Sequence, residues 1–165
     1  MRLVVSNTGP LLHLGEADAL MLLTWTGEVS IPKAVDREVT QQNPLWQSQK
    51  SAWIHVQELT APYKVEAEAW GHAGLLGSGE AEAIALARQV KAHWLLTDDA
   101  AARLFAQTLG IEVHGSVGIV LWAAAIGRLS RADTEAALDR LAQSSLWISP
   151  KVLTEAKAAL NQLFP

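Results

Sequence analysis

Short apolar runs alternate with longer stretches of helical periodicity along most of the chain. The short runs predict strands at Leu3–Val5, Glu28–Ile31, Trp94–Thr97, Ile111–His114 and, with a weaker alternating pattern that suits an edge, Trp53–Leu59. The longer stretches predict helices over Leu11–Thr24 with a hinge near Gly15, Pro32 to about Val39, Lys64–His72, Ser78 to about Val90, Asp98 or Asp99 to Gly110, Ser116–Ile126, Arg131–Gln143 and Pro150–Leu163. Asn7–Pro10 is interpreted as a turn. Such alternation indicates an α/β fold, with a mostly parallel central sheet and helices on both faces.

Length and composition narrow the class of protein. The chain has 165 residues and no cysteine, which predicts a single domain over residues 1–165 and excludes disulfides and cysteine-ligated metals. Its longest apolar stretch, Gly118–Gly127, is about half the length of a membrane span, and Leu3–Val5 is too short for an export signal. We therefore expect a soluble, cytoplasmic protein. The net charge of −4 excludes a basic surface over the whole molecule, so contact with nucleic acid requires a local patch or a bound cation.

Polar side chains follow three of the predicted strands at the point where each strand ends. Asn7 and Thr8 follow the first strand, Asp98 and Asp99 follow the Trp94–Thr97 strand, and Ser116 follows the Ile111–His114 strand. In open parallel sheets, ligands bind at the carboxyl ends of the strands, near the point where the strand order reverses. These residues are therefore candidates for one site.

Two further acids lie on helix faces that carry apolar residues. Helical spacing places Glu38 beside Val35 and Val39, and it places Glu80 on the face of Ala83, Ile84 and Ala87. Asp36 points away from Glu38 and is expected to be solvated. A carboxylate on a core-facing stripe is unfavourable unless something compensates for its charge.

A bound cation would compensate such a group of acids. Two carboxylates about 5 Å apart repel each other by roughly 3 kcal/mol at an effective dielectric constant of about 20. Scattered oxygen ligands suit a hard ion, Mg²⁺ or Mn²⁺, and such an ion can bind a phosphodiester and activate a water. Each residue alone also has a local explanation, because Asn7 suits a turn or cap, Asp98 or Asp99 an N-cap, and Glu80 a helix first turn. Glu38 alone is also compatible with snorkelling or with pairing to an arginine.

A further set of segments is spread along the chain: Val4–Leu11, Ile31–Val39, Gly77–Ala87, Leu95–Asp99 with Arg103, Gly115–Gly118 and Trp147–Ser149. Together they resemble the PIN domain family, in the branch of the prokaryotic VapC-type toxin ribonucleases, and the resemblance extends over nearly the whole chain. The resemblance implies a three-layer α/β/α fold and a metal-dependent ribonuclease. It also implies a homodimer that is blocked by a small antitoxin protein.

The resemblance also assigns site residues. It implies that Asn7, Glu38, Glu80 and Asp98 hold Mg²⁺ or Mn²⁺ with Asp99 close by, and whether Asp98 or Asp99 is the fourth acidic ligand stays open. Thr8 and Ser116 would be hydroxyls near the site that bind the substrate, and Arg103 would either contact a phosphate of the substrate or pair with Asp99. The first acid of the family pattern is usually Asp, and here Asn7 supplies an uncharged amide. The usual serine two residues later is Gly9.

This substitution favours a second hypothesis, an impaired PIN-like module that binds RNA or a protein without cleavage. A phosphoryl-transfer domain with Asp98 or Asp99 as acceptor is a weaker third hypothesis.

Lys33 and Arg37 share a helix flank near Glu38, where they either line a substrate path or are solvated. The five histidines show no metal-type spacing and receive no role. Most of the seven tryptophans are expected in the core or an interface, with stacking on RNA bases as the alternative for one or two.

Overall fold

Five parallel strands form the central sheet of the computed structural model, which describes residues 1–165. They are β1 (Leu3–Ser6), β2 (Glu28–Pro32), β3 (Ile54–Gln57), β4 (Trp94–Leu96) and β5 (Val113–His114), in the spatial order β3-β2-β1-β4-β5. The central strand β1 pairs Val4 with Val29 of β2 and with Trp94 of β4. Val4 and Val5 are both buried, as expected of a strand that is covered on both faces.

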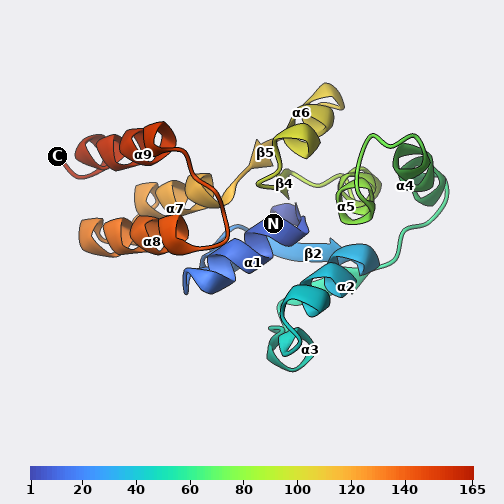
Figure 1. The fold of residues 1–165 in the computed structure, drawn as a ribbon, viewed down its shortest axis with the longest axis horizontal. Coiled ribbons are helices and arrows are strands. Elements are labelled where there is room, and N and C mark those ends of the chain that lie inside the picture. The colour runs from blue at the N-terminus through green and yellow to red at the C-terminus, as the bar shows by residue number, and fades with distance from the viewer.

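The helices are α1 (Thr8–Glu16), α2 (Lys33–Gln42), α3 (Trp46–Gln49), α4 (Tyr63–His72), α5 (Ser78–Gln89), α6 (Ala100–Thr108), α7 (Ser116–Ala125), α8 (Arg131–Gln143) and α9 (Pro150–Leu163), with a 3-10 helix at Leu20–Trp25. Figure 1 shows α7, α8 and α9 grouped at one end of the molecule and α4 and α5 at the other. None of the helices is both long and apolar enough to cross a membrane.

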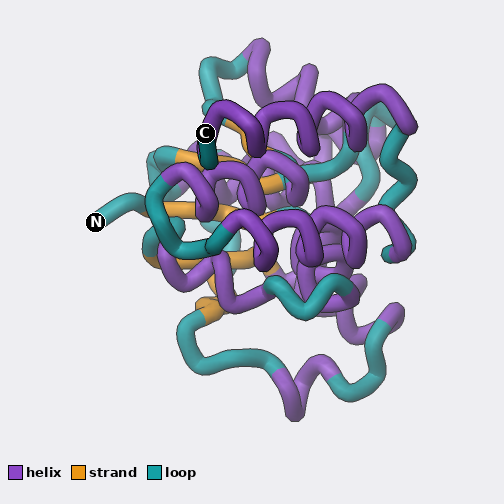
Figure 2. The backbone as a smooth tube through the Cα atoms, turned by 90° about the vertical axis from the view of Figure 1, so that its left-hand side faces the viewer, coloured by secondary structure: helices purple, strands orange, loops and turns teal.

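The connections between strands explain the layers. The chain steps from β1 through β2 to β3 toward one edge, and then crosses back to β4 and β5 at the other edge. α5 contacts β1, β2 and β4 and packs against α4 and α2, and α2 in turn packs against α1. The C-terminal helices α7 and α8 pack on α1, and Figure 2 shows the strands stacked between the helices. The predicted three-layer α/β/α fold with a parallel sheet is confirmed.

Several local features are as predicted. β3 forms an edge of the sheet. α6 is followed by Gly110, whose φ of +76° suits a glycine at a helix end. Most of the apolar face of α7 is buried, because α8 and α9 cover it.

The prediction of a turn at Asn7–Pro10 is wrong, because α1 already begins at Thr8 and Asn7 is its N-cap. Pro10 does not prevent this, since a proline in the first helical turn removes an N–H that has no partner within the helix. α5 begins at Ser78, as predicted, and its N-cap is Gly77. α3 was not predicted, because its four residues are too few for a helical period.

Asp36 is not solvated as expected, because it holds α3 against α2. Its carboxylate accepts hydrogen bonds from Trp46 Nε1 at 2.8 Å, Gln47 Nε2 at 2.9 Å and Lys50 Nζ at 3.0 Å. Burial alone would raise the pKa of the Asp36 carboxyl, but these bonds outweigh it and the pKa lies below its usual value. The buried Trp46 ring is thereby fixed on α2.

Candidate active site

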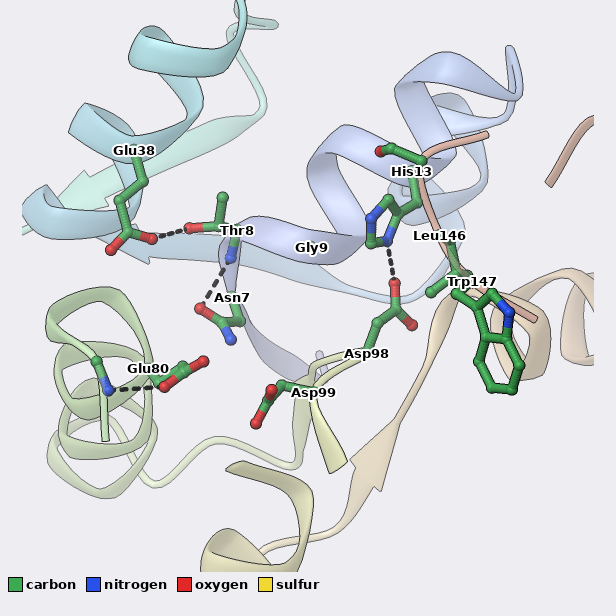
Figure 3. Close-up of a pocket in the computed structure, with 12 residues that line it drawn as sticks. Asn7, Thr8, Gly9, His13, Glu38, Glu80, Asp98, Asp99, Leu146 and Trp147 are labelled. Atoms are coloured by element: carbon green, nitrogen blue, oxygen red, sulfur yellow. Dashed lines mark hydrogen bonds and ion pairs between the residues drawn. The ribbon is translucent and has the colours of Figure 1, made fainter. Parts of the chain in front are cut away.

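The strand order reverses beside β1, and a pocket opens at the carboxyl ends of β1 and β4. Asn7 directly follows β1, and Asp98 and Asp99 lie just beyond β4. The backbone N–H of Asn7 donates to Leu96 O at 2.8 Å, which joins the two strand ends. The structure places Asn7, Glu38, Glu80, Asp98 and Asp99 around this one cavity of about 400 Å³ (Figure 3).

Glu38 reaches the pocket from α2 and is held from two sides. Its Oε2 accepts a hydrogen bond from Thr8 Oγ1 at 2.5 Å, and its Oε1 accepts one from Gly79 N at 3.0 Å. A Cβ atom at Gly79 would lie only 2.3 Å from Glu38 Oε2. Gly79 therefore lets the Glu38 carboxylate approach the first turn of α5, where the helix dipole favours a negative charge.

Glu80 and Asp99 line the pocket while they also satisfy helix ends. Glu80 Oε2 accepts from Gly77 N at 2.7 Å at the start of α5. Asp99 Oδ2 accepts from Ala102 N at 2.7 Å and caps α6. The capping explanation therefore holds for both residues, and it does not remove them from the pocket.

Asn7 is buried between the strand ends, and its amide is engaged at both atoms. The Oδ1 atom accepts from Thr8 N at 2.9 Å, and the Nδ2 atom donates to Thr97 Oγ1 at 3.2 Å. Thr97 Oγ1 also accepts from Asp99 N at 3.2 Å. These contacts connect Asn7 to the backbone that carries Asp98 and Asp99.

Asp98 points to the other side of the pocket, toward His13 (Figure 3), and it also contacts Ser116. Its Oδ1 accepts from Ser116 N at 2.7 Å, and its Oδ2 accepts from Ser116 Oγ at 2.6 Å and lies 2.7 Å from His13 Nδ1. Burial alone would raise the pKa of the Asp98 carboxyl, but the bonds from His13 and Ser116 lower it below its usual value. Asp98 is therefore a carboxylate with both oxygens engaged.

The donor set suits a hard divalent cation, although the side chains are not gathered around a single point. Four carboxylates and one amide line the pocket, and no lysine or arginine does. No group of three or more His, Asp or Glu side chains is close enough to hold one ion. Each carboxylate instead turns to its own local donor, as mutual repulsion favours.

Arg103 does not pair with Asp99, so one of the two predicted alternatives is wrong. The guanidinium forms none of the ion pairs of the structure, and its Nη2 lies 3.5 Å from Thr97 O. Lys33 and Arg37 line a separate cavity with Glu58, and Lys33 pairs with Glu58.

Two groups of pocket residues were missed. His13 received no role because the five histidines show no metal-type spacing, whereas in α1 its ring lies beside Gly9 and its Nδ1 contacts Asp98. Ser145 and Leu146 also line the pocket and lie in the loop between α8 and α9. Trp147 from that loop lies on the Asp98 side. Only the resemblance of Trp147–Ser149 to the family pattern had indicated this loop.

Comparison with known proteins supports the fold. A family model described as a PIN domain matches residues 3–162, which is almost the whole chain. No curated protein matches the chain significantly.

Proposed function

The chain belongs to the PIN domain family, whose fold is of the nuclease type, and on this premise we propose that it is a metal-dependent endoribonuclease. One observation carries the proposal. Five oxygen-bearing side chains from distant parts of the chain, Asn7, Glu38, Glu80, Asp98 and Asp99, line one pocket at the point where the strand order reverses. That pocket contains no lysine or arginine to balance the charge of the carboxylates.

Glu38, Glu80 and Asp99, with Asn7, would hold Mg²⁺ or Mn²⁺. Asp99 is the better fourth ligand, because its Oδ1 has no hydrogen bond, whereas Asp98 turns to the other side of the pocket, toward His13 and Ser116. When bound, such an ion supplies charge neutralisation for the phosphodiester and activation of the attacking water.

The remaining polar groups act on the carboxylates. The Thr8 hydroxyl donates to Glu38, and the Ser116 hydroxyl donates to Asp98. Both residues, which were predicted to bind substrate, are therefore better described as positioning residues. Both hydroxyls fix a carboxylate in one orientation, which preorganises the pocket before substrate binds. Arg103 stays the candidate for a phosphate contact, because it has no carboxylate partner and is only half-buried.

The resemblance to toxin ribonucleases extends the proposal to physiology. We infer a cytoplasmic toxin that forms a homodimer and is inhibited by a small antitoxin protein. Expression of the chain alone should arrest bacterial growth, and expression of the Glu80→Gln variant should not. Growth arrest by both forms would contradict a toxic effect through RNA cleavage.

Cleavage of end-labelled RNA in Mn²⁺ tests the nuclease activity. Wild-type protein should cleave, EDTA should stop cleavage, and Glu80→Gln should reduce the rate by at least about 100-fold. The glutamine amide oxygen can still accept the Gly77 N–H, so the start of α5 is preserved. Glu68→Gln, on the exposed surface of α4, is the matched control and should cleave normally.

A binding module without cleavage is the second candidate function. It is favoured by the uncharged Asn7 and by the separation of the carboxylates into local hydrogen bonds. RNA binding by both wild type and Glu80→Gln, with cleavage by neither, would support this alternative over the nuclease.

A further inference from the structure

The pocket lined by Asn7, Glu38, Glu80, Asp98 and Asp99 is called the acidic pocket below. A second cavity of about 440 Å³ lies directly beside it. Asp98, Leu146 and Trp147 line both cavities, so the two are continuous around Trp147. The second cavity differs in character, because its walls include the apolar side chains of Val113, Ile148 and Val152. An apolar hollow next to a polar, acidic one suits a ligand that has both an apolar face and a charged backbone.

Trp147 is the most exposed of the seven tryptophans, with 81% of its accessible area open to solvent. Figure 3 shows its indole on the Asp98 side of the acidic pocket, opposite Glu38 and Glu80. An exposed aromatic ring that borders two cavities can offer its face to a flat group of a ligand. Trp147 is therefore placed to receive a flat group that also reaches the acidic pocket.

The loop that carries Trp147 is fixed at both ends. Ser145 donates from its N and Oγ to the carboxylate of Glu16 at 2.6 and 2.7 Å, which ties the loop to the end of α1. Ser149 Oγ accepts from Val152 N at 3.1 Å and caps α9. A ring on an anchored loop loses little conformational entropy when it binds a ligand.

Arg103 provides the charge that such a ligand would need. It is the only lysine or arginine that lines either cavity, and it has no ion-pair partner. A Cβ atom at Gly115 would lie 2.7 Å from Arg103 Nη2, so the glycine leaves room for the guanidinium. A half-buried guanidinium without a carboxylate partner is a suitable donor for a phosphate.

From this arrangement we propose that the second cavity is a nucleobase subsite, in which one base of a single-stranded RNA stacks on Trp147 while Arg103 binds the adjoining phosphate. The inference rests on the proposed function and adds the site that holds the nucleotide next to the cleaved bond. Stacking on an aromatic ring tolerates every base, so the subsite favours unpaired RNA without strict sequence preference. A protein segment as occupant would need no phosphate contact, and Arg103 favours RNA over it.

The test uses binding without cleavage. A fluorescently labelled ribopentanucleotide and a strand of the same length without bases are titrated with the full chain in EDTA, and anisotropy is recorded. Wild type should bind the base-containing strand about tenfold or more tightly than the abasic strand. Trp147→Ala should remove this preference, Trp147→Phe should keep most of it, and Arg103→Gln should weaken binding of both strands equally.

Two outcomes would overturn the subsite. One is equal affinity of wild type for the two strands, and the other is unchanged RNA affinity in Trp147→Ala. Circular dichroism of each variant confirms folding, which an exposed tryptophan should not affect. The binding experiment contains no divalent ion, so its result does not depend on cleavage. Failure of the wild type to cleave RNA in the separate Mn²⁺ assay would count against the nuclease and would leave the binding result unchanged.

Discussion

Asn7 contributes an uncharged amide beside the four carboxylates of the acidic pocket. Its amide oxygen can coordinate a hard cation, but it adds no negative charge to offset the desolvation of the ion. The amide also provides a donor, and its Nδ2 bonds to Thr97 at the end of β4. Compared with an aspartate, Asn7 should therefore bind a cation more weakly, but its amide links the ends of β1 and β4 without adding charge.

The Asn7→Asp variant should therefore bind Mn²⁺ about tenfold more tightly than wild type, because a nearby carboxylate adds Coulombic attraction. The lost donor can be replaced, since Thr97 Oγ1 can donate to the new carboxylate. Isothermal titration calorimetry measures the change, and Asn7→Ala should bind more weakly than both. Unchanged or weaker binding in Asn7→Asp would argue against an ion beside residue 7.

Residue-scale reasoning from the sequence located the acids but not their partners. Helical spacing placed Glu38 and Glu80 on inward faces, and both line the pocket. Asp98 and Asp99 could not be separated, because either residue can end the strand and cap the next helix. The structure separates them through the cap of α6 on Asp99 and the contacts of Asp98 with Ser116, which is distant in sequence.

At the scale of elements, the start of α5 positions a carboxylate of α2. In Gly79→Ala, the new methyl group would meet the Glu38 carboxylate, the flexible end of a side chain that can turn away. The free energy of unfolding should change by less than about 1 kcal/mol, since alanine also favours the helix. Mn²⁺ affinity and RNA cleavage should fall by roughly 10–100-fold, as for a lost positioning contact.

Chemical denaturation and calorimetry separate these two effects. Gly71→Ala in α4 is the matched control, because no atom lies within 4 Å of its new Cβ. That variant should leave Mn²⁺ affinity unchanged. Equal Mn²⁺ affinity in wild type and Gly79→Ala would show that the position of Glu38 does not matter to the site.

The link between α2 and α3 should make stability depend on pH. The pKa of Asp36 is lower in the folded chain than in the unfolded one, so its bonds stabilise the fold above the unfolded pKa of about 3.9. This stabilisation is lost as the pH falls through the folded pKa. Asp36→Asn should therefore be less stable than wild type by about 1–3 kcal/mol at pH 6, and the difference should shrink toward pH 3.

Urea unfolding at several pH values measures this difference. Asp133→Asn, on the exposed side of α8, controls for loss of a carboxylate as such. A constant gap between wild type and Asp36→Asn from pH 6 to pH 3 would contradict the role assigned to the Asp36 carboxylate.

Most elements could be predicted from the sequence, because their apolar periods are long enough to recognise. α3 could not, since its four residues depend on contacts of Trp46 and Lys50 with Asp36 for their position. The start of α1 was missed because Asn7 and Pro10 favour turns as well as helix starts. His13 was also missed, because its partner Asp98 lies 85 residues away in the sequence.

At the scale of the whole molecule, the order of strands decides which residues meet. Apolar runs predict strands but do not say which strands are neighbours, so the contact of Asn7 with the end of β4 rested on the expected fold class. β1 lies between β2 and β4, and this arrangement brings residues from the first and the middle part of the chain together. The acidic pocket is thus a consequence of topology.

The four carboxylates of the acidic pocket should make the stability of the whole chain depend on metal binding. An ion that binds only the folded state stabilises it by about 2.7 kcal/mol at 100 times its Kd, which for a chain of this size raises Tm by roughly 5–10 °C. Differential scanning calorimetry with saturating Mn²⁺ should show this shift, and NaCl of equal ionic strength should not. A variant with both Glu38→Gln and Glu80→Gln should lose most of the Mn²⁺ shift, because two of the ligands no longer carry a negative charge. An equal Mn²⁺ shift in wild type and in this double variant would place the ion outside the acidic pocket.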